Sequence, residues 1–76
     1  MNWDGLTTAG AYTYRQANLP GNNAPPVGYS FGIVLVFRST EGTVAQIVIA
    51  HQAGGDGRTV LYRVKFGTWG PWQSIA

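Results

Sequence analysis

The chain contains no cysteine and few charged residues. Its five Lys or Arg and three Asp or Glu make up 11% of the 76 residues, less than half of the roughly 25% usual in soluble domains; there is also one His. The absence of cysteine excludes a disulfide framework and a cysteine-based zinc site. A chain of this length forms one small core. Because neither disulfides nor metal support that core, we expect it to rely on a partner subunit.

Long apolar runs and clusters of like charge are also missing. No segment approaches the ~20 apolar residues of a membrane helix, and no charged-then-apolar leader is visible at the N-terminus. The basic residues behind the net charge of +2 are scattered along the chain, whereas a nucleic-acid-binding surface needs a clustered basic stripe. We therefore predict no membrane insertion and no nucleic-acid partner.

Apolar and aromatic residues, in contrast, are well represented. Hydrophobic residues make up 45% of the chain, and there are three Trp, four Tyr and three Phe. Intrinsically disordered chains are poor in such residues. The composition therefore predicts a folded domain, in which Gly, Ser, Thr, Asn and Gln take the place of charge.

Short alternating segments separated by glycine-containing turns predict an all-β fold. Their spacing is typical of an antiparallel meander. The expected strands span residues 10–16, 29–38, 43–50, 58–66 and 69–75. In the second of these, both faces are apolar from Ile33 onward, which favours a central strand covered on both sides. We expect a small antiparallel β-meander knob of about five strands, with one short helical turn within residues 2–8.

The segment 17–28 is expected to be a loop, because it is rich in proline, asparagine and glycine. It is long for a connection inside a compact domain. Two interpretations follow: the loop is functional, or it packs on the surface of the sheet.

Residues suited to catalysis or metal binding are few and dispersed. General acid–base catalysis usually needs paired carboxylates or a histidine with an orienting partner. Glu41 and Asp56 stand in turns beside glycine, as solvated turn residues do, and a lone Asp56 is weak support for a cation site. His51 follows a predicted strand, where a surface position is the ordinary expectation and a ligand-binding or titrating role the alternative. We predict a protein that is not an enzyme and has no cofactor and no metal.

The aromatic residues at the C-terminal end are more informative. Trp69 and Trp72 stand three positions apart in the sequence WGPW. In a continuous strand this spacing points the two side chains to opposite faces, one inward and one outward. Trp69 would then be a plate for stacking a carbohydrate or a partner, and the alternative is that both rings plug the end of a small sheet.

Two polar residues lie within otherwise apolar strands. Gln46 stands between Val44 and Val48, and Arg63 stands between two apolar neighbours. A guanidinium can stack on an aromatic ring while its N–H groups bond to amides or carbonyls. A contact of Arg63 with Trp72 or Gln46 would be a structural polar network; ligand binding by Arg63 is the alternative.

Several short motifs follow one another along the chain. They are L-T at Leu6–Thr7, G-x-Y at Gly10–Tyr12, A-N-x-P at Ala17–Pro20, Q-I at Gln46–Ile47, Y-R at Tyr62–Arg63 and W-x-x-W at Trp69–Trp72. In this order and spacing the sequence resembles the pyocin-knob domain of bacteriophage tail fibres and R-type pyocin fibres. The similarity covers residues 3–75. The proline-rich stretch 22–27 departs from the pattern, lengthens the loop and would alter a surface built there.

The resemblance implies a structural and recognition role. Residues 1–76 would be a single pyocin-knob-like tail-fibre domain, a module of a longer fibre protein that forms a homotrimer. Its location would be the virion tail fibre, extracellular when acting and made in the bacterial cytoplasm. The implied partners in viral attachment to the host are a bacterial surface polysaccharide or an outer-membrane receptor. Whether the knob binds glycan or only spaces the shaft is left open, and a monomeric carbohydrate-binding module attached to a bacterial-surface hydrolase is the alternative.

The resemblance also sorts the candidate residues. The family-like positions that we expect to define the fold are Gly10, Tyr12, Pro20, Gln46, Arg63 and Trp72. The candidate contacts to a ligand or partner are Trp69, which also matches the family pattern, Tyr14, Asn23 and His51.

Overall fold

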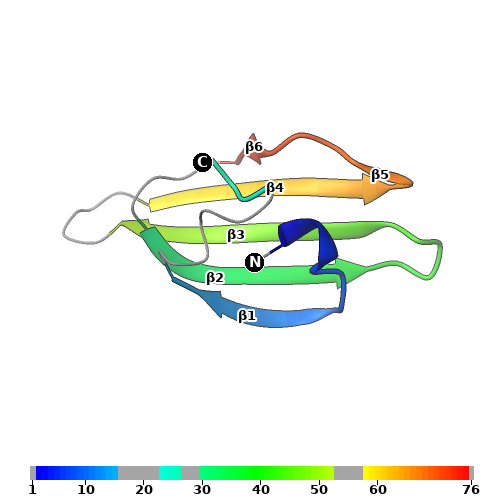
Figure 1. Cartoon of the computed structure of the whole chain (residues 1–76), viewed down its shortest axis with the longest axis horizontal. Helices are drawn as coiled ribbons and strands as arrows, with labels where there is room; N and C mark the ends of the chain where they lie inside the picture. The colour runs from blue at the N-terminus through cyan, green and yellow to red at the C-terminus, as the bar shows by residue number, and fades with distance from the viewer. Residues whose placement is uncertain (1, 16–22, 27–29, 53–57, 76) are drawn as a thin grey trace.

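Three long strands with alternating apolar residues form the centre of the structure. The computed structural model describes residues 2–15, 23–26, 30–52 and 58–75. These residues form one antiparallel sheet of six strands and one 3-10 turn (Figure 1). The elements are η1 Trp3–Gly5, β1 Gly10–Tyr14, β2 Ser30–Arg38, β3 Val44–Gln52, β4 Arg58–Phe66, β5 Thr68–Trp69 and β6 Gln73–Ser74. The all-β fold class, the antiparallel arrangement and the helical turn near the N-terminus are thereby confirmed.

The strands pair in the order in which they occur along the chain. The order across the sheet is β1-β2-β3-β4-β5, and β6 also pairs with β4. Local chemistry closes the turn between β2 and β3: Ser39 Oγ accepts hydrogen bonds from the backbone N–H groups of Glu41 and Thr43, at 3.2 and 3.0 Å. Gly42 follows with a φ of +95°, a conformation that side chains with a Cβ rarely adopt. The meander is thus set by short-range turn signals.

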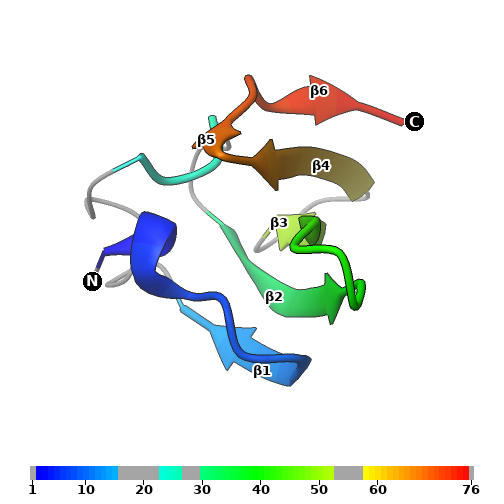
Figure 2. The ribbon, with the colours of Figure 1, turned by 90° about the vertical axis from the view of Figure 1, so that its right-hand side faces the viewer.

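The pleat of the sheet separates its side chains into two faces. Directly paired residues share a face, as Tyr12, Val34 and Val48 do. We call this the covered face; it holds the even-numbered positions of β1, β2 and β3 and the odd-numbered positions of β4. The remaining positions of these strands form the open face. Figure 2 shows η1 and the segment 23–26 on one and the same side of the sheet.

The hydrophobic core lies between the covered face and the N-terminal turn. The buried apolar residues in the described part of the chain are Trp3, Tyr14, Val34, Val36, Val44, Val48, Ala50 and Leu61. The indole of Trp3 meets the ring of Tyr14 edge-on, with 5.6 Å between ring centroids, a favourable aromatic geometry. Trp3 on η1 thus belongs to one core cluster with buried residues of β1, β2, β3 and β4.

The open face corrects one prediction about β2. This strand is central in the sheet, between β1 and β3, but the described residues of the chain cover it on one side only. Its open-face side chains remain exposed, with Phe31 at 42%, Ile33 at 43% and Phe37 at 54%. The apolar pattern of β2 is the same on both faces, so the sequence could not show that the described part of the chain covers only one of them.

The predicted strand 69–75 is also different in the structure. Two short strands, β5 and β6, replace it, with residues 70–72 between them. Lys65 pairs with Trp69, and Tyr62 pairs with Gln73. The two paired residues are three positions apart in β4 but four positions apart in the final segment. The extra residue makes a bulge. The first strand is shorter than predicted as well, since pairing with β2 ends at Tyr14.

Some predicted features lie outside the described residues. These are Pro20 with most of the loop 17–28, and Asp56 with the glycine-rich turn that contains it.

Candidate functional site

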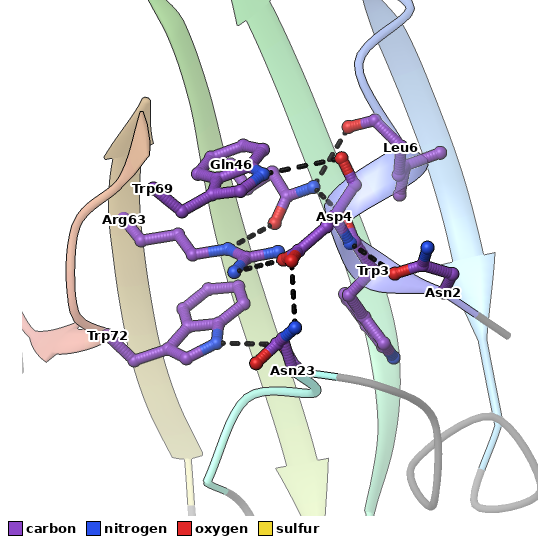
Figure 3. Close-up of polar contacts among 9 residues, drawn as sticks. All are labelled: Asn2, Trp3, Asp4, Leu6, Asn23, Gln46, Arg63, Trp69 and Trp72. Carbon is purple, nitrogen blue, oxygen red and sulfur yellow. Dashed lines mark hydrogen bonds and ion pairs between the residues drawn. The ribbon is translucent and has the colours of Figure 1, made fainter. Parts of the chain in front are cut away.

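Arg63 forms the centre of a polar cluster on the covered face. It lies in β4 directly opposite Gln46 of β3, and it is only 3% exposed. Its Nε donates a hydrogen bond to Gln46 Oε1 at 2.8 Å, and its Nη1 donates to Asp4 Oδ1 at the same distance (Figure 3). The charge of this buried guanidinium is therefore paired with a carboxylate, as buried charges must be.

Two tryptophans enclose the guanidinium of Arg63. Its Cζ lies 4.0 Å from the ring centroid of Trp69 and 4.7 Å from that of Trp72, both within the range of a cation–π interaction. The prediction that the two rings point to opposite faces is wrong. The bulge between β5 and β6 adds one residue, which shifts the alternation of side chains and brings both rings to the covered face.

The surroundings of Arg63 act on its charge in opposite directions. Burial lowers the pKa of Arg63 from its ordinary value, and the hydrogen bond and negative charge of Asp4 oppose this shift. Nη2 is buried, and within the described part of the chain it has no hydrogen-bond partner. The two indole rings supply the compensation at this position, because their negative faces attract the cation.

Gln46 is fully buried, and both ends of its amide are used. Its Nε2 donates hydrogen bonds to the backbone carbonyl oxygens of Trp3 and Leu6, at 2.8 and 2.9 Å. Its Oε1 accepts from Arg63. The predicted contact of Arg63 with Gln46 and Trp72 is present. The amide thereby ties two carbonyl groups of the N-terminal segment to β3; that of Trp3 also accepts from the backbone N–H of Leu6 at 3.2 Å.

Asp4 links the N-terminal turn to three other parts of the fold. Its carboxylate accepts hydrogen bonds from Arg63 and, at 2.7 Å, from Asn23 Nδ2. Its backbone carbonyl accepts from Trp69 Nε1 at 3.3 Å. The side chain of Asn2 caps the turn by accepting from the backbone N–H of Asp4. One short turn thus holds the acceptors for β4, for the segment 23–26 and for β5.

Asn23 and Trp72 close the other side of the cluster. Trp72 Nε1 donates to the backbone carbonyl of Asn23 at 3.1 Å. The ring of Trp72 also meets Trp3 edge-on at 6.2 Å between centroids. The set of Trp3, Asp4, Asn23, Gln46, Arg63, Trp69 and Trp72 is called the Arg63 cluster below. Its members come from both ends of the chain and from its middle (Figure 3).

An open hollow of about 640 Å³ lies beside the Arg63 cluster. Its lining combines the two tryptophans with Pro71, and it includes polar groups of Asp4 and Lys65. Clefts that bind small ligands have this size and this mixture of aromatic and polar groups. The hollow is the candidate recognition site of the molecule.

The other predicted contact residues are not all brought to this hollow. Asn23 lines it together with Trp69. Tyr14 does not lie on the surface: it is 2% exposed and packs in the core, because its position in β1 falls on the covered face beneath Trp3. His51 is exposed on the open face, where its ring meets that of Phe31 edge-on at 5.0 Å.

The family-like residues of β1 have local roles. Tyr12 packs against the core, and its hydroxyl donates to the carbonyl of Thr8 at 2.7 Å. Gly10 lies beneath it, where an added Cβ would stand 3.3 Å from the Tyr12 hydroxyl oxygen.

Two residues of the Arg63 cluster were missed by the sequence analysis. Asp4 and Trp3 were assigned no role of their own, although the turn that contains them was predicted. The one sequence feature that could have indicated a role for them is that a charged and an aromatic residue are adjacent in a chain with few charges. Only the fold shows that this pair meets residues about sixty positions further along the chain, as with Arg63 and Asp4.

Within the described residues, no group of three His, Cys, Asp or Glu side chains could hold a metal ion. The search for long apolar helices, made over the same residues, finds none that could cross a membrane. In comparisons with known proteins, no family model, curated protein or solved structure matches the chain.

We predict that the conformation of Asn23 contributes to the stability of the cluster. Asn23 has a positive φ of 58°, which favours Asn or Gly over residues with an ordinary Cβ. Replacing Asn23 with Ala should lower the free energy of unfolding by about 1–2 kcal/mol, because it removes the bond to Asp4 and strains the backbone. In urea unfolding, the Asn23→Gly control should lose less, since glycine relieves the strain. Equal losses in both variants would contradict the backbone contribution.

Proposed function

We propose that the chain is a non-enzymatic module of a phage tail fibre, or of a phage-tail-like bacteriocin, that builds the fibre and contributes to recognition of receptors on bacterial surfaces. One observation supports this proposal most. Four of the residues that carry the resemblance to the pyocin-knob domain, Gln46, Arg63, Trp69 and Trp72, meet in a single cluster. Motif residues that are scattered in sequence and joined in space are what a shared fold requires.

The cluster itself supports a structural role for these residues rather than a chemical one. The buried guanidinium is stacked between two rings and paired with Asp4. Its donors at Nε and Nη1 are already engaged. Nη2 has no hydrogen-bond partner among the described residues, and the guanidinium is stacked on the indole rings instead. A buried network of this kind fixes one arrangement of the segments that it joins, which suits a repeated structural module.

The location in a fibre can be tested on intact particles. Antibodies raised against this chain should label the tail region of phage or bacteriocin particles produced by the strain that encodes it, as seen by electron microscopy. Antibodies against a cytoplasmic protein of the same strain serve as the control. Particles that carry no label, although the chain is detected in the lysate, would exclude the fibre role.

A second candidate function is that of a monomeric carbohydrate-binding module. The observation in its favour is the hollow, where tryptophan and proline surfaces lie beside Lys65 and Asp4. Sugars bind proteins through aromatic surfaces combined with a few placed polar groups. The two candidates differ in oligomeric state, because the fibre module is expected to be a homotrimer and the second candidate is not.

Recognition through the hollow predicts a specific loss of binding. The chain, displayed in several copies to add avidity, should bind bacterial glycans on an array. Pro71→Ala and Lys65→Ala should each weaken this binding by about tenfold while the fold is retained, because both residues line the hollow without a hydrogen bond in the Arg63 cluster.

The matched control is Thr13→Ala, an exposed position of β1 away from the hollow. If Pro71→Ala and Lys65→Ala bind glycans as strongly as Thr13→Ala and the unmodified chain do, the hollow is not the recognition site. A loss in the control as well would point to a different surface.

A further inference from the structure

The open face of the sheet is apolar and exposed over three neighbouring strands. Six of its large side chains are at least 41% exposed, and Phe66 reaches 71%. They are Phe31, Ile33, Phe37, Ile49, Val64 and Phe66. Among all the described residues, Ile75 is the one further large apolar side chain in this exposed class. The exposed apolar surface is therefore concentrated on one face.

The area of this surface is that of an interface. From their exposed fractions, the six side chains alone present roughly 500 Å² of apolar surface, if an aromatic side chain offers about 200 Å². The largest apolar patch on a typical monomer is about 300–600 Å² and is often functional. Leu35, Ile47, Val60 and Tyr62, which are partly exposed on the same face, add to this area. Two such faces together therefore exceed the total of about 1,000 Å² that a specific interface needs.

The open face is also free of net charge in its described part. From Phe31 to Phe37, from Ala45 to His51 and from Val60 to Phe66, none of its described side chains is an Asp, Glu, Lys or Arg. A neutral face offers nothing for a charged partner to complement. It is, however, compatible with itself, because two copies brought together meet no like-charge repulsion.

We propose that the open face packs against the open face of a second copy of this chain. The proposal deepens the assembly role proposed above and rests on it, and it assigns the surface through which the copies meet. Two sheets pack face to face about 10 Å apart when β-branched side chains interdigitate between them. Ile33, Ile49 and Val60 form such a row across β2, β3 and β4. The phenylalanines at both ends of these strands extend the contact.

The first measurement is the mass of the chain in solution. Light scattering, from about 1 µM to about 500 µM, should give twice the 8.2 kDa of one chain at the higher concentrations. A mass of 8.2 kDa throughout this range would overturn the proposal and leave a flanking segment or a different protein as the occupant of the face. Two copies would support the pairing of open faces and contradict the homotrimer of the proposed function. Three copies would support the homotrimer and contradict the pairing, because a face that packs on the same face of another copy is satisfied by two chains.

The second measurement places the association on the open face. Ile49→Lys should abolish the oligomer, or weaken it at least a hundredfold, because it puts a charge in the centre of the row. Thr40→Lys adds the same charge in the exposed turn between β2 and β3 and should leave the mass unchanged. An Ile49→Lys chain that retains the mass of the oligomer would exclude this face as the interface.

A third measurement does not depend on the fold of the Lys variant. Because the chain has no cysteine, Ile49→Cys supplies a single thiol at the centre of the open face, and Thr40→Cys supplies one in the turn. The rate of maleimide labelling at Ile49→Cys should fall at least tenfold from low to high protein concentration, while that at Thr40→Cys stays constant. An oligomer in which the Ile49→Cys thiol reacts as fast as in the monomer would show that the copies meet elsewhere.

Discussion

Replacing Gln46 with Leu should lower the free energy of unfolding by about 3–5 kcal/mol, which is most of the stability of a domain this small. The substitution leaves Arg63 Nε without its acceptor and takes the Gln46 donor from the carbonyl group of Leu6. It also removes one of the two hydrogen bonds that the Trp3 carbonyl accepts, the other coming from the backbone N–H of Leu6. All of these groups lie in or beside the buried cluster, where water does not replace the lost partners. The leucine itself fits the volume, so the loss comes from unpaired polar groups.

Chemical unfolding of matched glutamine variants measures this effect. Gln73→Leu is the control, since Gln73 is exposed in β6 and should change the free energy of unfolding by less than about 0.5 kcal/mol. The double variant Gln46→Leu with Arg63→Leu should lose less than the sum of the single losses, with a coupling of about 1–3 kcal/mol. A Gln46→Leu chain within about 1 kcal/mol of the original would show that the cluster does not hold the fold together.

Replacing Gly32 with Ala should destabilise the sheet by about 3 kcal/mol or more, as overpacking of a rigid site does. A Cβ at this position would stand 2.0 Å from the backbone carbonyl oxygen of Ile49 and 3.3 Å from the Cα of Ala50. Both neighbours are backbone atoms of the paired strand β3, so they cannot rotate away as a side chain would. The strands β2 and β3 must separate locally to admit the methyl group.

The natural control for Gly32→Ala is Gly5→Ala. An added Cβ at Gly5 has no heavy atom within 4 Å, and this variant should keep its thermal unfolding temperature within a few degrees. The Gly32→Ala variant should unfold at least about 10 °C lower. If both variants unfold together, the close approach at Gly32 is absorbed by the sheet at little cost, and the prediction is wrong.

The strands were predictable because the sequence features that define them, alternating apolar residues and glycine-containing turns, lie within the strands or next to them. Alternation and glycine turns identified all three long strands to within two residues at each end. The contact of Arg63 with Gln46 was predictable too, since polar residues inside apolar strands need partners. The split of the last strand was not, because the bulge depends on how the residues after Trp69 meet β4.

The covered and the open face could not be distinguished by periodicity. In β2 both faces are apolar, so the same pattern is compatible with a strand buried on two sides or on one. The role of Asp4 escaped prediction for a related reason: its partners come from residues 23, 63 and 69, and nothing in the neighbouring sequence indicates them.

The long reach of the Arg63 cluster has a consequence for the order of folding. Its hydrogen bonds join residues separated by 43, 49, 59 and 65 positions, so the Arg63 cluster cannot form until residues 63–72 have been synthesised. During synthesis, the hairpin of β2 and β3 can form before β4 has left the ribosome, whereas the contacts of the N-terminal turn with Arg63, Trp69 and Trp72 form only afterwards. Such distant contacts slow folding. Until then, both faces of the partly formed sheet are apolar and uncovered. The chain is therefore most prone to misassembly in the interval between the formation of the β2–β3 hairpin and the synthesis of Trp72.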